Sequence, residues 1–206
     1  MNLVFLGAPG AGKGTQTKRL IKNFHFTHLS TGDLLRKLIV EKHPLGIKAK
    51  SFMDEGSLVP DSLIIDMIKT QMTKKKGYVF DGFPRTLAQA EALDQITNID
   101  KVVFLDIPQK EVIRRLTGRR ICRKCGFEYH VEFLPSKKGK VCEKCGGNLY
   151  QRDDDKEGVI KKRLSVFTSL TTPLIQYYEN KLLRMQAIGT VEEIYKKITE
   201  GLNLSS

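Results

Sequence analysis

A glycine-rich stretch near the start of the chain, GAPGAGKGT at positions 7–15, limits the possible folds more than any other feature. The apolar run NLVFL before it is typical of a buried parallel strand, and residues 13–24 after it read as a helix. Gly7, Gly12 and Lys13 match the spacing G-x-x-x-x-G-K. Glycines let backbone N–H groups converge on one anion, and the helix N-terminus adds its dipole. The stretch therefore predicts a site for the phosphates of a nucleoside triphosphate, with the Lys13 ammonium at the β- and γ-phosphates.

One position departs from the common form of this loop. Gly14 follows Lys13, so the hydroxyl of Thr15 comes one place later than the serine or threonine that usually binds magnesium. The role of Thr15 is therefore less defined than that of Lys13. A tight strand-to-helix turn without a ligand is the alternative, which the combination of strand, loop and helix disfavours.

Apolar runs alternate with helical segments along most of the chain. We expect strands at residues 2–7, 26–30, 77–81, 101–108 and 183–188. We expect helices at residues 13–24, 32–42, 44–56, 60–73, 86–94, 109–120 and 191–202, and a long helix from residue 156 onward that is kinked at Pro173. This order predicts an α/β fold with a doubly wound parallel sheet and helices on both faces, where ligands bind at the carboxyl ends of the strands.

A second motif for anion binding is FDGFPRT at positions 80–86. Asp81 ends an apolar strand, where a carboxylate can hold the water shell of Mg²⁺, and Arg85 can fork a phosphate. Gln89 follows one helical turn later, and its amide can both donate to and accept from an adenine edge. The alternative is that Asp81 caps the following turn while Arg85 is solvated.

All four cysteines fall between positions 122 and 145 and form two C-x2-C pairs, which is the spacing of a four-thiolate zinc site. Disulfides are the alternative. We see neither a signal peptide nor an apolar run long enough to span a membrane, so we expect a cytoplasmic protein whose thiols stay reduced. With four cysteine ligands no position remains for catalysis, so the metal should hold the shape of this segment, and we interpret His130 as an ordinary packing or surface residue.

The chain carries 35 lysines and arginines against 23 acidic residues, a formal net charge of +12. Such an excess favours anionic partners, which include nucleic acid, acidic membranes and phosphorylated small molecules, but charge alone does not distinguish them.

Together these stretches resemble the adenylate kinase family in its long-lid, zinc-containing form. The resemblance runs nearly end to end and rests on GAPGAGKGT, STGDLLR, DGFPRT, GRR, the paired cysteines, QRDDD and TTPLIQYY. It implies a P-loop core at residues 1–29, 60–117 and 156–206, with two mobile inserts: an AMP-binding insert at 30–59 and a zinc-binding lid at 118–155. It also implies the Mg²⁺-dependent reaction ATP + AMP ⇌ 2 ADP, carried out by a cytoplasmic monomer that binds ATP, AMP and ADP but neither nucleic acid nor membrane.

The resemblance further implies the residues of the site. Contacts to ATP are expected from Gly10, Ala11, Gly12, Lys13, Gly14, Thr15, Arg119, Glu128, Tyr129 and Val191. Contacts to AMP are expected from Thr31, Arg36, Ser57, Leu58, Val59, Gly82, Phe83, Pro84, Arg85, Gln89, Arg152 and Arg163. The residues expected around the transferred phosphoryl group are Lys13, Asp81, Arg85, Arg119, Arg152 and Arg163, and the expected zinc ligands are Cys122, Cys125, Cys142 and Cys145.

Two other functions compete with this interpretation. A related kinase with GTP as donor, or with CMP or UMP as acceptor, would use the same phosphate-binding motifs. A zinc ribbon on a basic chain could bind nucleic acid, but the aromatic residues of the insert do not lie obviously on one face as a stacking platform would require.

Overall fold

The computed structural model describes residues 1–72 and 77–204 and is built around a parallel sheet of five strands in the order β2-β3-β1-β4-β8. The strands are β1 (Leu3–Gly7), β2 (Thr27–Ser30), β3 (Tyr78–Asp81), β4 (Lys101–Asp106) and β8 (Leu182–Gln186). The chain runs from β1 out to β2, returns to β3, and then adds β4 and β8 on the other side of β1. This order confirms the predicted doubly wound sheet and creates a ligand crevice at the carboxyl end of β1, where the strand order reverses.

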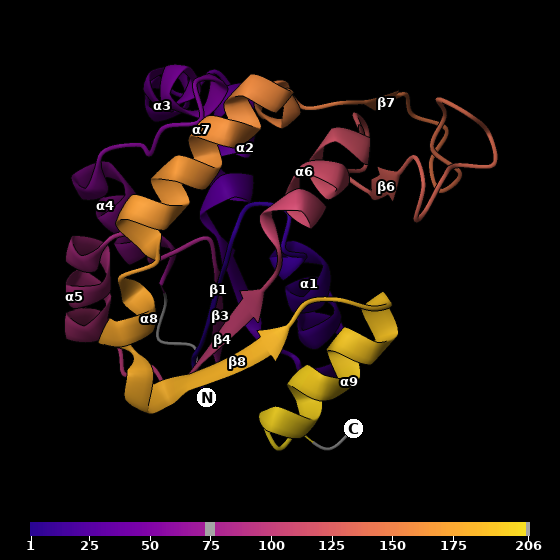
Figure 1. Ribbon diagram of the computed structural model, residues 1–206. Helices are drawn as coiled ribbons and strands as arrows, with labels where there is room; N and C mark the ends of the chain where they lie inside the picture. Colours follow the sequence, from indigo (N-terminus) through magenta and orange to yellow (C-terminus); the bar gives the residue numbers. More distant parts are fainter. Residues whose placement is uncertain (73–76, 205–206) are drawn as a thin grey trace.

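One face of the sheet is covered by the helices α2 (Thr31–Val40), α3 (Pro44–Asp54), α4 (Asp61–Gln71), α5 (Leu87–Ile96) and α8 (Leu174–Tyr177), as Figure 1 shows. Alternate side chains of the strands point to this face, for example Val4 and Phe80, which are fully buried. They pack against helix residues such as Leu93 and Ile68. Burial of side chains of this size stabilises the fold by about 1.5–3 kcal/mol each.

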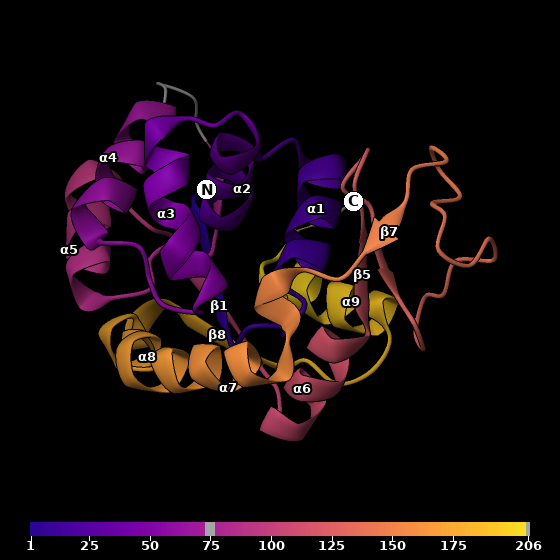
Figure 2. The same cartoon turned by 90° about the horizontal axis from the view of Figure 1, so that it is seen from above.

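The opposite face is covered by α1 (Lys13–Phe24) and α9 (Val191–Gly201), which lie side by side in both views (Figures 1 and 2). Leu3 and Phe5, the neighbours of Val4 along β1, point to this face because side chains alternate along a strand. The start of α9 is fixed by a capping box, in which Thr190 and Glu193 each bond the backbone N–H of the other.

A separate small sheet projects from the body of the molecule beyond α6 (Gln109–Gly118) and α7 (Glu157–Val166) (Figure 1). It consists of β5 (Arg119–Cys122), β6 (Glu128–His130) and β7 (Leu149–Tyr150) in the antiparallel order β6-β5-β7. Apolar contacts between α6 and α7, through residues such as Leu116 and Ile160, form the base from which this segment extends.

The structure corrects two of the predicted helices. The helix expected over residues 109–120 ends at Gly118, because Arg119 and Arg120 pair with β6 as the first residues of β5. The long helix from residue 156 changes before Pro173: α7 ends at Val166 and continues as the π-helical turn η2 (Phe167–Thr171). Pro173 then precedes α8, where its missing N–H is not needed.

The other predicted elements agree with the structure to within a few residues. The short 3₁₀ turns η1 (Asp153–Asp155) and η3 (Glu179–Lys181) are additional. The predicted end of the fourth helix at position 73 lies outside the described residues. Within the described parts of the chain, none of the helices combines the length and apolar character that crossing a membrane requires.

Candidate active site

The glycine-rich loop joins β1 to α1 as predicted and wraps around the ammonium group of Lys13. Gly10 and Gly12 have φ angles of +79° and +95°, a conformation that side chains rarely adopt. The Lys13 Nζ donates to the backbone carbonyls of Gly7 at 2.7 Å and Ala8 at 3.0 Å. Burial lowers the pKa of Lys13 to about 8, opposed by Asp81 and aided by nearby guanidinium groups. An anion bound at the loop would raise the pKa of Lys13 again.

Several arginines from distant parts of the chain gather near this loop. Burial, and then repulsion from Arg163, lowers the pKa of Arg85 to about 10. Burial, and then repulsion from Arg119 and Arg36, lowers the pKa of Arg152 to about 10. Burial also lowers the pKa of Arg163. The carboxylate of Asp154 opposes this shift, and repulsion from Arg119 lowers the pKa further. Apart from Arg36, which is predicted to contact AMP, these arginines are those predicted to surround a transferred phosphoryl group, and a polyanion would relieve their repulsion.

Asp81 lies at the carboxyl end of β3 and faces α1. Its side chain is nearly buried, and its Oδ2 atom lies 3.5 Å from the Thr17 hydroxyl. A Cβ on Gly14 would come within 3.4 Å of the same oxygen, so a side chain at that position would reduce the space beside the carboxylate. Asp81 is therefore placed where a carboxylate can hold a hydrated metal ion next to the phosphate-binding loop.

The acidic run after β7 holds two of the arginines in place. Arg119 donates from Nε and Nη2 to the two carboxylate oxygens of Asp155, at 2.8 and 2.6 Å, and Asp155 is fully buried. Arg163 lies 3.2 Å from the carboxylate of Asp154 and 3.3 Å from that of Asp155. Burial opposes ionisation of Asp154, but Arg163, Arg119 and Arg152 together lower its pKa. The bidentate geometry fixes the plane of the Arg119 guanidinium.

Three further residues predicted to contact ATP come from β6 and from the first residue of α9. Glu128 on β6 bonds Lys18 of α1 at 3.2 Å, which ties the small sheet to the core. The Tyr129 side chain is buried against the cysteines, with its hydroxyl 3.5 Å from the Cys142 sulfur. The Val191 carbonyl accepts a hydrogen bond of 3.1 Å from the Gln16 amide. Tyr129 therefore has only its backbone available for a nucleotide.

A cavity between α2, α3, α4 and α5 contains most of the residues predicted to bind AMP. It encloses about 600 Å³ of empty space, open to solvent. The predicted residues that line it are Thr31, Arg36, Ser57, Leu58, Val59, Gly82, Arg85, Gln89 and Arg163. The lining residues that sequence reasoning missed are Gly32, Leu35, Met53, Gly56, Ile64 and Asp154. Gly32, Leu35 and Asp154 fall within the stretches STGDLLR and QRDDD, whereas Met53, Gly56 and Ile64 are small or apolar and belong to no quoted motif.

A second cavity adjoins the first and reaches the phosphate-binding loop. It is lined by Lys13 and Pro84, and it shares Arg85 and Arg163 with the first cavity. Of the remaining predicted AMP residues, Phe83 is fully buried and packs on Phe80, so it has only its backbone to offer. Of the residues predicted to contact ATP, Lys13 is the one that lines this second cavity, which therefore connects the phosphate-binding loop with the first cavity.

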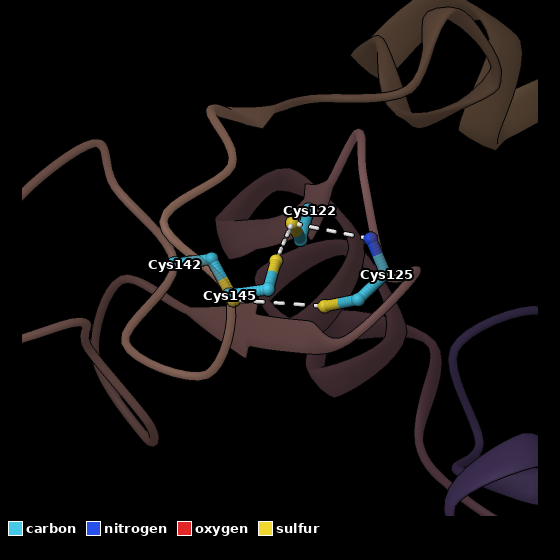
Figure 3. A group of neighbouring side chains, drawn as sticks. All are labelled: Cys122, Cys125, Cys142 and Cys145. Carbon is cyan, nitrogen blue, oxygen red and sulfur yellow. Dashed lines mark hydrogen bonds between the residues drawn. The ribbon is translucent and has the colours of Figure 1, made fainter.

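The four cysteines come together at the far end of the small sheet, as Figure 3 shows. Their sulfur atoms all lie within 4.8 Å of one another, with separations of 3.4 Å for Cys122 and Cys145 and 3.7 Å for Cys125 and Cys142. These separations are too long for disulfides, and all four cysteines are free thiols. Each pair closes a tight turn on a glycine with positive φ, Gly126 or Gly146. The predicted four-thiolate cluster is confirmed, and its donor set suits zinc.

Comparison with known proteins agrees with this geometry. The family model described as adenylate kinase matches residues 5–183. The chain is 50% identical to an adenylate kinase of Syntrophobacter fumaroxidans, over 97% of this chain and 98% of the relative. It is 49% identical to one of Thermodesulfovibrio yellowstonii over 96% and 97%, and 47% identical to one of Archaeoglobus fulgidus over 96% of each chain.

The sheet order, the glycine-rich loop and the arginines that gather near this loop define a P-loop phosphotransferase that acts on nucleotides. The chain belongs to the adenylate kinase family.

Proposed function

We propose that this chain transfers the terminal phosphoryl group of ATP to AMP and forms two molecules of ADP. The observation that carries the proposal is the set of cationic side chains at the junction of the two cavities, where each perturbs the pKa of the next. ATP would lie with its phosphates on the glycine-rich loop, and AMP would occupy the cavity beside Gln89. The two phosphate chains would then meet at Arg85 and Arg163, which line both cavities.

Phosphoryl transfer requires positioning and charge neutralisation more than covalent chemistry from the protein. The AMP phosphate is already an anionic nucleophile, so no side chain has to remove a proton from it. Lys13 would hold the donor phosphates, while Arg85 would orient the acceptor phosphate in line with them. Arg119, Arg152 and Arg163 would balance the charge that spreads over the transferred group.

Water competes with AMP for the phosphoryl group, so the site has to exclude it during transfer. The small sheet carries Arg119 and Glu128 and contacts α1 through Lys18. We infer that residues 118–155 form a lid and residues 30–59 an AMP-binding insert on a core of residues 1–29, 60–117 and 156–206. Closure of both inserts would place the arginines and remove water together.

Asp81 fits a role in holding magnesium, because its carboxylate is nearly buried and faces the loop that would hold the phosphates. When bound with ATP, Mg²⁺ would neutralise part of the phosphate charge. Thr17 lies beside Asp81 and restrains its orientation.

The cysteine cluster fits a structural zinc ion. Four thiolates complete a tetrahedral shell, so no position is left for a substrate or a water. The lid segment has only a small core around Cys122, Tyr129 and Cys142, and segments of this size usually need a metal or disulfides to fold. We further propose that the protein works as a cytoplasmic monomer.

The test is a coupled assay of ADP formation from ATP with AMP, CMP, UMP and GMP offered in turn, followed by GTP as donor with AMP. We expect AMP with ATP to give the highest kcat/KM, with two ADP formed for each ATP consumed. If CMP or UMP gave a higher kcat/KM than AMP, the proposed acceptor would be wrong. If GTP gave a higher kcat/KM than ATP, the proposed donor would be wrong. Absence of transfer to any monophosphate would contradict the proposal altogether.

A further inference from the structure

The side-chain amide of Gln89, at the wall of the first cavity, is held by two groups of the protein. A glutamine amide can accept two hydrogen bonds at its oxygen and donate two from its nitrogen. The backbone N–H of Arg85 donates to Oε1 at 2.8 Å, and Nε2 donates to the Asp61 carboxylate at 2.7 Å. One lone pair and one N–H remain, and Gln89 is among the residues that line the cavity.

Asp61 is the first residue of α4, and its carboxylate contacts α5 twice. Its Oδ1 accepts from Gln89, and its Oδ2 accepts from the Thr86 hydroxyl at 2.8 Å. The Thr86 oxygen in turn accepts the backbone N–H of Gln89 at 3.2 Å and caps α5. Because an ionised carboxylate can only accept, Thr86 and Gln89 must both act as donors to Asp61.

The same contacts make the two orientations of the Gln89 amide unequal. A half-turn of the amide would bring Oε1 against the Asp61 carboxylate, so that two acceptors would face each other. It would also bring the amino group against the Arg85 N–H, so that two donors would face each other. Two hydrogen bonds in a nearly buried position would be lost. Asp61 and Arg85 therefore select one orientation.

The orientation matters because purines differ in the order of donors and acceptors on their edges. A 6-amino purine presents an amino donor beside the ring acceptor N1. A 6-oxo purine presents a carbonyl acceptor beside an N1–H donor. An amide that has one free lone pair and one free N–H matches the 6-amino purine in one orientation. After a half-turn it matches the 6-oxo purine instead. A site built for one pattern rejects the other, because its polar groups are left unpaired.

We propose that Asp61 is a specificity-determining positioning residue, which fixes the Gln89 amide in the orientation that accepts a 6-amino purine monophosphate and rejects a 6-oxo purine. The inference rests on the proposed function, in which this cavity takes the acceptor nucleotide. Asp61 acts only through Gln89 and does not itself touch the base. This role could not be predicted from the sequence, because Asp61 and Gln89 are 28 positions apart.

The test compares AMP with inosine monophosphate, which carries a 6-oxo purine and is otherwise the same size. In D61N the new amide can face Gln89 with either its oxygen or its amino group, so the Arg85 N–H alone still opposes the half-turn of the Gln89 amide. We expect the ratio of kcat/KM for AMP to that for inosine monophosphate to fall by about tenfold or more. The KM for ATP should stay within about twofold of the wild type, because the donor site is separate.

Two further variants separate this role from a general effect on α4. D66N removes a carboxylate from an exposed position of the same helix and should leave the ratio unchanged. D61S takes the place of D61N if D61N fails to fold. Its hydroxyl can both donate and accept, so it should also lower the ratio of kcat/KM for AMP to that for inosine monophosphate. Melting curves would establish that each variant is folded.

The outcomes distinguish this inference from the proposed function. If the wild type transfers phosphoryl groups to AMP but the ratio in the folded Asp61 variants is unchanged, the positioning role is wrong and the proposed function stands. Equal proportional losses with both acceptors would also overturn the positioning role, since a purely structural residue would give that result. If the wild type does not use AMP, the proposed function itself fails.

Discussion

Asp155 binds the guanidinium of Arg119 and also contacts that of Arg163. It is fully buried, and its two carboxylate oxygens accept hydrogen bonds from Nε and Nη2 of Arg119. In D155A the Arg119 guanidinium would stay largely buried without its partner, and breaking such a pair costs about 3–5 kcal/mol. We expect the free energy of unfolding, measured with urea, to fall by about that amount, and kcat/KM to fall as Arg119 loses its orientation.

Asp153 gives a matched control from the same acidic run. Its side chain is 71% exposed, and it forms an ion pair of 3.0 Å with the exposed Lys156. Exposed ion pairs contribute little, so D153A should change the free energy of unfolding by less than about 0.5 kcal/mol. Equal losses in D153A and D155A would show that the buried fork is not the source of the effect.

His130 makes the lid sensitive to acid. Its Nδ1 accepts the backbone N–H groups of Glu132 at 3.0 Å and Phe133 at 3.1 Å, which only the neutral ring can do at that nitrogen. Burial lowers the pKa of His130, although the Arg114 carbonyl and Glu132 oppose the shift. The unfolded chain therefore binds a proton at higher pH than the folded chain. Stability should fall as the pH drops through about 6.5 and level off below the folded pKa.

H130N tests this dependence, because the asparagine oxygen can accept the same two N–H groups and does not titrate. Melting temperatures of the wild type and H130N would be compared at pH 7.5 and 5.5. The wild type should lose more stability over this interval than the variant. An identical loss in both proteins would assign the acid sensitivity to other groups.

At the residue scale, the sequence predicts those functional side chains that belong to short motifs with a fixed spacing. Lys13 follows from the glycine pattern, and the cysteines follow from two C-x2-C pairs. Asp61 and Gln16 could not be predicted, because their partners Gln89 and Val191 lie far away in the sequence. Only the fold shows which polar side chains share a partner.

At the scale of elements, periodicity predicts the sheet and most helices correctly. It fails in the lid, where β6 and β7 span only three and two residues and are too short for a pattern to develop. It also fails at η2, where the helix widens into a π turn that is held by the Thr171 hydroxyl on the Arg85 carbonyl at 2.9 Å. Tertiary contacts, not local propensity, decide these segments.

At the scale of elements, the structural role proposed for the cysteine cluster is tested most simply by removing one ligand. C142S removes one buried ligand of the cluster and should reduce the zinc content of the purified protein. The melting temperature should fall by about 2–4 °C for each kcal/mol lost, while some activity remains because the phosphate-binding loop is intact. Complete loss of activity with an unchanged melting curve would contradict a structural role for the metal.

At the scale of the whole molecule, the fold brings together cations that no local segment could assemble. Lys13 begins α1, Arg85 precedes α5, and Arg163 lies on α7, yet all three line one cavity at the carboxyl ends of the strands. The parallel sheet achieves this because every strand ends at the same edge. The lid then adds Arg119 above that edge, held by Asp155. The boundaries of the lid and of the AMP-binding insert stay predictions.

The most direct test of two facing nucleotides is a crystal structure with a dinucleotide in which two adenosines are joined by a chain of phosphates. We expect one base to lie beside Gln89 and Thr31, the phosphates among Lys13 and the arginines, and the second base near Val191. A structure in which one adenosine occupied the first cavity and the other lay in solvent, with the glycine-rich loop empty, would contradict this expectation.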